Sequence, residues 1–274
     1  MTVRVGRTWR VARACVAVGL ALPGGLAWAQ DAEQGHELWK ISLGAGVVSR
    51  PEYPGSESNE TRALPLVNVR YGRFFLGGVP GSGSPAGLGA YLYEDSSWNV
   101  GVVISGDVED PRQESDDARL RGLGDIDGTA RAGLFASYRV GWVTLRGSAH
   151  SDVAGKGQGT IASFDAEATF RPLPGLTLSA GPGVTWGNRG YMQTFFGIDA
   201  DQAARSGLAQ YQVDSGANLA RVSFGAQYEL TPQWSLGSRI TAARLLGDAA
   251  DSPIVGDRNQ NTFALFVAYR LQTR

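Results

Sequence analysis

The sequence is poor in the residues that crosslink secreted proteins or build many catalytic centres. Its one cysteine is Cys15, and its only two histidines are His36 and His150. No disulfide can form within the chain, so another device must hold a secreted fold together. We recognise no catalytic triad and no metal-ligand set, so we expect no enzyme active site and no cofactor.

Long hydrophobic runs are missing downstream of Gln30. The longest charge-free stretch there, residues 74–93, is interrupted by prolines and glycines. Such interruptions exclude a membrane-spanning helix, which needs about 20 consecutive apolar residues.

The first 29 residues have the pattern of a secretory signal peptide. Four arginines precede an apolar run at 15–22, and Ala27-Trp28-Ala29 forms a small-x-small cleavage site. We predict cleavage after Ala29 and a mature domain of residues 30–274; an N-terminal helix of that domain is the alternative. The mature part has 21 basic and 26 acidic residues, because residues 1–29 hold four of the 25 basic ones. Its net charge of −5 argues against a nucleic-acid partner.

Strict alternation of apolar and polar residues dominates what remains, most clearly in residues 159–187. There Phe164, Ala166 and Ala168 alternate with Asp165 and Glu167, and the pattern resumes after a Pro-Gly turn. Side chains alternate across a strand, so the pattern predicts an antiparallel hairpin with one apolar and one polar face. A soluble β-sandwich shows the same alternation, so the hairpin alone does not decide the class.

Twelve such strands follow one another, and their connections fall into two groups. Those after the even-numbered strands are short turns, and those after the odd-numbered strands are longer. Sorted loops with an even strand count are typical of outer-membrane barrels. We therefore predict an all-β, transmembrane, antiparallel up-and-down barrel of about 12 strands, with short periplasmic turns and long extracellular loops. Glycine, at 38 residues, suits a sheet that must bend to close.

The two faces of such a barrel have different surroundings. We expect the apolar face to contact outer-membrane lipid and lipopolysaccharide, with aromatic side chains near the strand ends, and the barrel-assembly machinery to insert the chain. The polar face lines the lumen, where mixed charges could pair and fill the space or form a selectivity ring. The candidate lumen charges are Arg131, Arg146, Asp165, Glu167, Arg171, Arg221, Glu229 and Arg239.

Three further motifs give weaker signals of function. His150 lies on the polar face of a strand, where a lumen-wall role is favoured over a Ser-His-Asp site. Asp125-Ile126-Asp127-Gly128 resembles a calcium loop, but position twelve is Ala136 and not Glu. Residues 201–207 predict a short helix with an acidic start and a glycine stop, within the longest insertion, residues 188–215.

Four segments together resemble the MltA-interacting protein (MipA/OmpV) family of Gram-negative outer-membrane proteins. They are Gly44–Val47 with Pro51–Ser56, Leu120–Asp127, Tyr191–Ile198 with Ser206–Leu208, and Leu245–Val255. All four fall partly in the long loops. The candidate site residues within them are Tyr53, Pro54, Gly55, Gly124, Asp125, Asp127, Tyr191, Phe195, Phe196, Gly197, Gly247, Asp248, Ser252 and Pro253. Members usually end on an aromatic residue, whereas here Leu271 takes that place and Gln272-Thr273-Arg274 follow.

The resemblance implies a non-enzymatic role. The family's namesake is described as a scaffold that joins a murein-cleaving lytic transglycosylase to a murein synthase, so both are expected partners by resemblance. Other members are linked to adhesion and to drug or osmotic response. A surface adhesin is therefore one alternative, and the polar inner face makes a small-solute pore another.

Overall fold

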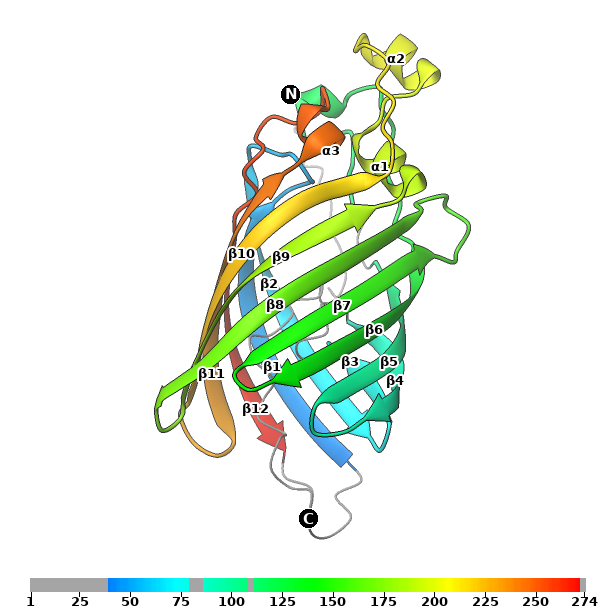
Figure 1. Cartoon of the computed structure of the whole chain (residues 1–274). Coiled ribbons are helices and arrows are strands. Elements are labelled where there is room, and N and C mark those ends of the chain that lie inside the picture. Colours follow the sequence, from blue (N-terminus) through cyan, green and yellow to red (C-terminus); the bar gives the residue numbers. More distant parts are fainter. Residues whose placement is uncertain (1–38, 79–85, 108–110, 272–274) are drawn as a thin grey trace, which may run out of the picture.

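The chain forms one closed barrel of twelve antiparallel strands (Figure 1), as the sequence predicts. The computed structural model describes residues 39–78, 86–107 and 111–271. The predicted signal peptide, its cleavage site and His36 lie outside these residues. Each strand pairs with its neighbours in sequence, and β1 closes the barrel against β12. The strands are β1 (Trp39–Pro51), β2 (Asn59–Tyr71), β3 (Phe74–Gly77), β4 (Gly87–Glu94), β5 (Trp98–Gly106), β6 (Ala130–Val140), β7 (Val143–Asp152), β8 (Thr160–Leu173), β9 (Leu176–Gly187), β10 (Gly216–Glu229), β11 (Trp234–Leu245) and β12 (Thr262–Leu271).

Short turns and long connections lie at opposite ends of the barrel, as expected. Three of the short turns contain a glycine with positive φ: Gly72 at 55°, Gly141 at 58° and Gly175 at 78°. Tight hairpin turns need such a backbone, which glycine adopts without a steric penalty. Strand bounds differ modestly from the predicted ones: β2 begins at Asn59 and not near Arg62, and β3 is described only from Phe74 to Gly77.

The two faces of the wall differ as the alternation predicts. Most large apolar side chains of the wall are exposed on the outside, and the inner face is mainly polar or small, with exceptions such as Phe75, Phe135 and Phe266. Exposed members on the predicted outer face include Leu43, Val47, Ile104, Leu134, Phe164, Leu178, Phe224, Ile240, Phe263 and Leu265. A surface of this kind is stable only in contact with lipid.

Aromatic pairs mark the short-turn end of the barrel. Trp39 stacks on Tyr71 with ring centroids 4.6 Å apart, and Trp98 stacks on Tyr138 at the same separation. The Trp234–Tyr269 pair is similar at 4.9 Å. These amphipathic rings lie where the hydrocarbon meets the headgroups, which is where aromatic girdles occur.

Glycine serves packing inside the barrel as well as curvature. A Cβ at Gly237 would collide with the ring of Phe266, and one at Gly101 with the ring of Phe135. The inward rings of Phe75, Tyr91 and Phe135 form a cluster in which Phe75 and Phe135 meet edge to face at 5.9 Å. Part of the lumen is therefore filled by aromatic side chains that lie over glycines of neighbouring strands.

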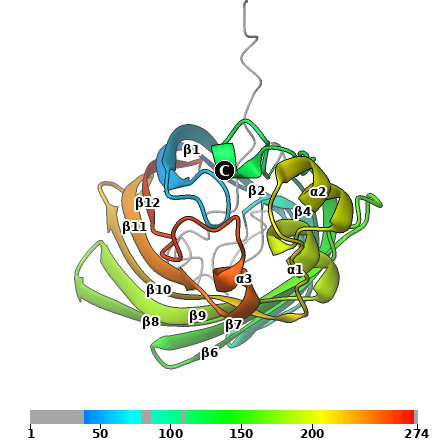
Figure 2. The same cartoon turned by 90° about the horizontal axis from the view of Figure 1, so that it is seen from above.

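Helices are confined to the long-loop end, where they lie over the mouth of the barrel (Figure 2). They are η1 (Ala118–Leu120), α1 (Arg189–Phe196), α2 (Ala200–Ser206) and α3 (Gly247–Asp251). The helix predicted at 201–207 is confirmed as α2, whose Asp199 and Gln202 form a capping box and whose Gly207 stops it in the left-handed region. In the described ranges no helix has both the length and the hydropathy to span a bilayer.

Candidate functional site

Charged side chains cross the lumen from strand β8. Glu167 is 3% exposed and accepts hydrogen bonds from Arg146 on β7, at 3.0 Å, and from Arg239 on β11, at 3.1 Å. The second contact passes over β9 and β10 to reach a strand three positions along the barrel wall. One carboxylate therefore ties two arginines together inside the barrel.

A second pair lies on the same face of β8. Nη2 of Arg221 on β10 donates to both carboxylate oxygens of Asp165, each at 2.7 Å. Its Nη1 donates to Thr185 Oγ1 at 2.6 Å. Gly183 lies between the two strands, and a side chain there would collide with Asp165. We call Arg146, Asp165, Glu167, Arg221 and Arg239 the lumen ladder.

The remaining candidate lumen charges do not join this ladder. Arg131 is buried, donates to Gln158 Oε1 at 2.5 Å and lies 3.5 Å from Asp107, near the long-loop end. Arg171 and Glu229 are exposed near the short turns. His150 is buried on the inner wall, and among the described residues neither of its ring nitrogens has a hydrogen-bond partner.

The long connections pack together into a compact unit that we call the cap: residues 52–58, 111–129, 188–215 and 246–261. Two apolar clusters hold it together. One joins Phe195 and Phe196 of α1 to Ala249 and Ala250 of α3. The other is built from Tyr53, Leu120, Leu123, Ile198 and Ile254. The loop parts of the four segments that carry the family resemblance thus meet in one place, whereas Gly44–Val47 lies in β1 of the wall.

Hydrogen bonds lock these segments to one another. The Tyr53 hydroxyl donates to the Ile254 carbonyl at 3.3 Å, and Ser252 Oγ donates to the Phe196 carbonyl at 2.6 Å. Gly55, at φ 101°, donates to Gln260 Oε1 at 2.9 Å and accepts from the backbone N–H of residue 256. A Cβ at position 55 would collide with Val255, so glycine is needed for this approach.

The other predicted loop residues take different places in the cap. Tyr191 stacks on Phe195, Gly197 ends α1 and Gly247 begins α3. Gly124 donates to Glu114 Oε1, and Asp125 accepts from the Glu114 N–H at 2.8 Å. Pro54 is half-buried, whereas Asp248 and Pro253 are exposed. In the parts of the chain that the structure describes, no group of three or more Asp, Glu, His or Cys side chains is placed to hold a metal ion.

Tyr53 is buried at the centre of the second cluster. Burial, together with the nearby Asp117 carboxylate, raises the pKa of Tyr53 to about 12. The hydroxyl therefore remains protonated, and able to donate to Ile254, at any physiological pH.

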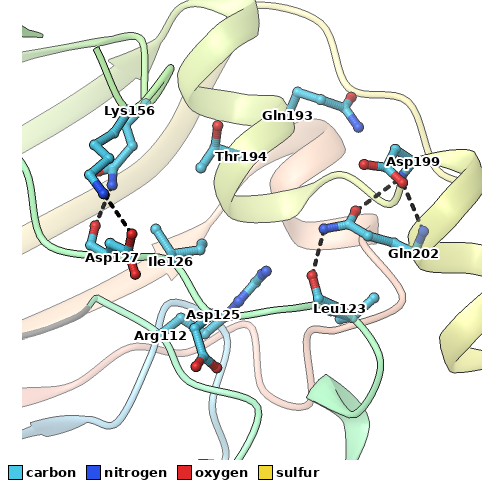
Figure 3. A pocket seen from close by; sticks show the side chains of 11 residues that line it. Arg112, Leu123, Asp125, Ile126, Asp127, Lys156, Gln193, Thr194, Asp199 and Gln202 are labelled. Carbon is cyan, nitrogen blue, oxygen red and sulfur yellow. Dashed lines mark hydrogen bonds and ion pairs between the residues drawn. The ribbon is translucent and has the colours of Figure 1, made fainter. Parts of the chain in front are cut away.

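A cleft of about 300 Å³ opens between the cap and the loop that joins β7 to β8 (Figure 3). Eleven residues line it: Arg112, Leu123, Asp125, Ile126, Asp127, Lys156, Gln158, Gln193, Thr194, Asp199 and Gln202. Lys156 Nζ lies 2.7 Å from Asp127 at one side, and Asp199 caps α2 at the other. Such a volume is at the lower end of small-molecule sites.

Of the residues that line this cleft, only Asp125 and Asp127 were predicted site residues; Arg112, Lys156, Gln158 and Asp199 were not, and Arg112 is the most buried of the charged ones. It is 2% exposed, its Nη1 lies 3.4 Å from the Phe195 carbonyl, and its Nε has no partner among the described residues. Burial lowers the pKa of Arg112, although several nearby acids oppose this. Nothing in its local sequence sets Arg112 apart from any other arginine of a polar loop; only its place just before the 120–127 motif was a signal.

Comparisons with known proteins agree with this architecture. The family model of MltA-interacting protein MipA matches residues 43–271. The MltA-interacting protein of Escherichia coli K12 is 27% identical over 235 residues, which is 84% of this chain and 90% of that protein. YiaT of the same strain, named as an outer membrane protein, is 26% identical over 84% of this chain and 91% of its own length.

Solved structures similar to this chain are outer-membrane barrels. An outer membrane channel from Pseudomonas putida F1 has a TM-score of 0.48 at 16% identity, with 88% of this chain and 98% of that chain covered. The toluene transporter TodX of Pseudomonas putida has a TM-score of 0.43 at 11% identity, over 91% and 94% of the two chains. Neither match carries a functional argument.

The lipid-facing wall, the sorted loops and the likeness to the E. coli outer membrane protein YiaT place the protein in the outer membrane. The family model spans nearly all of the described residues, from β1 to β12. The chain therefore belongs to the MltA-interacting protein MipA family.

Proposed function

We propose that this barrel is a non-enzymatic scaffold that holds a murein-cleaving lytic transglycosylase close to a murein synthase at the inner surface of the outer membrane. The observation that carries the proposal is family membership together with the name of the E. coli relative, an MltA-interacting protein that matches over 84% of this chain. Both enzymes act on murein, so they would approach from the periplasm.

A periplasmic partner would meet the short-turn end of the barrel. There the hairpin of β8 and β9 carries exposed Arg171 and Leu173, and Glu229 is exposed at the end of neighbouring β10. Glu229 N donates to the Gly175 carbonyl at 2.9 Å, which ties the two hairpins together. A fixed, exposed surface with apolar and charged groups suits a docking role.

Two features support an adaptor over a wide channel. The lumen ladder spans the inside of the wall from β7 to β11, and the cap lies over the mouth. Both place side chains where a solute would pass.

Affinity capture tests the scaffold directly. The detergent-solubilised barrel should retain a purified lytic transglycosylase and a murein synthase of the same organism. An Arg171→Glu/Leu173→Asp variant should lose capture, and a Pro253→Ala variant at the opposite end should keep it. Failure of the unaltered barrel to retain either enzyme would contradict the proposal.

A small-solute pore is the second candidate, because the inner wall is polar. Planar-bilayer recordings separate the two functions. A scaffold with a packed lumen should show no stepwise conductance, and Glu167→Gln should not create a steady open channel. Regular conductance steps in the unaltered protein would favour the pore.

A further inference from the structure

We infer that the cleft between the cap and the β7–β8 loop binds a small zwitterion of the amino-acid or short-peptide class, with its carboxylate on Arg112 and its ammonium group on Asp199. This site faces away from the periplasm and is independent of the proposed scaffold. The inference rests on the hydrogen bonds and ion pairs that the lining side chains already make. Arg112 is the buried side chain among them that makes too few.

Arg112 is the group of the cleft that would bind a carboxylate. Figure 3 shows its guanidinium directed into the middle of the cleft, while the side chain is 98% buried by the surrounding cap. Its Nη1 makes one long contact of 3.4 Å with a backbone carbonyl, and Nε makes none with any described residue. A buried guanidinium without a carboxylate partner is costly, and a planar carboxylate matches its donors in pairs.

Other polar side chains that line the cleft are already engaged, among them Asp125, which accepts from the Glu114 N–H at 2.8 Å. Gln158 links the Asp127 carbonyl to Arg131, and Gln193 accepts from the Val213 N–H at 3.0 Å. Arg112 is therefore the group on which an anionic end would be held.

Asp199 is the group that would bind the ammonium end of the ligand. Its Oδ1 accepts from the Gln202 N–H at 2.8 Å, and the side chain is otherwise exposed along the cleft wall. Lys156 forms an ion pair with Asp127 at 2.7 Å on the other side of the cleft, so these two charges neutralise each other. With Arg112 and Asp199 both lining a cleft of about 300 Å³, a molecule with both charges is favoured over a simple anion, which Asp199 would repel.

Dialanine and its two blocked forms test the assignment with the full-length barrel in detergent. Isothermal titration calorimetry should detect dialanine binding, and dialanine amide, which lacks the carboxylate, should bind at least about tenfold more weakly. N-acetyl-dialanine, which lacks the ammonium group, should lose several-fold.

Matched substitutions assign each end of the ligand. Asp199→Asn retains the helix cap, so it should weaken dialanine binding several-fold and leave N-acetyl-dialanine binding unchanged. Arg112→Gln should abolish binding of both. Because Arg112→Gln could loosen the cap, protease protection of residues 188–215 is compared in each variant, and the Asp199→Asn result stands without it. No heat with dialanine up to 10 mM (roughly −2.7 kcal/mol of binding), or equal affinity for dialanine in Asp199→Asn, would overturn the inference.

Discussion

The barrel wall and the cap are built by opposite rules. The wall turns its apolar side chains outward and encloses a ladder of ion pairs, with Glu167 between Arg146 and Arg239. The cap encloses its apolar side chains, with Phe196 and Ile254 buried, as in a water-soluble protein. The difference follows from the solvent, because lipid surrounds the wall and water surrounds the cap.

The contrast also separates what each region is suited to do. Inside the wall, the paired charges are satisfied by each other, so they fill space. In the cap, the guanidinium of Arg112 is buried beside a cleft, and no carboxylate of the described residues forms an ion pair with it.

The largest effect is expected from Phe196→Ala. Phe196 is 1% exposed, and truncation of a buried phenylalanine costs about 4 kcal/mol. Because Phe196 lies in the cap alone, residues 188–215 should become protease-sensitive while the barrel keeps its heat-modifiable gel migration. Phe170→Ala, at a lipid-facing position that is 65% exposed, is the matched control and should leave the cap protected. Equal cleavage of the two variants would mean that the cap has no core of its own.

Glu167→Gln should have the opposite effect: it should destabilise the barrel and leave the cap protected. The substitution leaves Arg146 and Arg239 without their shared carboxylate inside the barrel, which costs about 3 kcal/mol. The temperature at which the barrel loses its folded gel migration should fall, and the cap should remain protected until then. Glu229→Gln, at an exposed position, should change stability by less than about 0.5 kcal/mol. A similar temperature for both variants would show that the ladder is not stabilising.

Gly237→Ala tests the fit between inward glycines and aromatic rings. The added methyl group would meet the ring of Phe266, and overpacking of this kind costs about 2 kcal/mol. Gly106→Ala is the matched control, because a Cβ there has open space around it. The denaturant midpoint should fall for the first variant only, and a fall in both would implicate backbone effects instead.

The smallest effect concerns Tyr53 and pH. Its pKa is raised from 10.0 to about 12, so the folded cap favours the protonated hydroxyl. This contribution to stability is complete below pH 10 and is lost as the pH rises through 12. Protease protection of residues 188–215 should therefore decline over this window, and less steeply in Tyr53→Phe. Tyr191, whose pKa burial also raises to about 12, is present in both proteins and accounts for the remaining decline. Identical curves would argue against a role for Tyr53.

At neutral pH Tyr53→Phe should cost less than about 1 kcal/mol, because it removes a single hydrogen bond of 3.3 Å to the Ile254 carbonyl. The same protease assay at pH 7 measures this. A large loss of protection there would mean that the hydroxyl has a second structural role.

Much of the wall could be predicted from the sequence. Alternation with a period of two fixes which face of each strand meets lipid, and it correctly separates Phe164 and Phe224 from Asp165 and Arg221. The short turns are also local, because Gly72 or Gly175 specifies a tight reversal by its backbone alone. Helix α2 was predictable for the same reason, since both its caps lie within its own sequence.

The cap could not be predicted in the same way. Helices α1 and α3 are short, and their apolar residues are buried only because segments far apart in the sequence converge on them. The family resemblance pointed to the right loops but not to their contacts, and Arg112 gave no signal of its own.

The sequence alone was enough to predict a barrel of about 12 strands, its lipid-facing side and its sorted loops, because each depends on neighbours along one strand or turn. The tertiary structure was needed to show that Glu167 joins arginines of β7 and β11, that the long loops share one core, and that buried Arg112 has no carboxylate partner among the described residues. These contacts depend on the closure of the barrel, which brings distant strands and loops together.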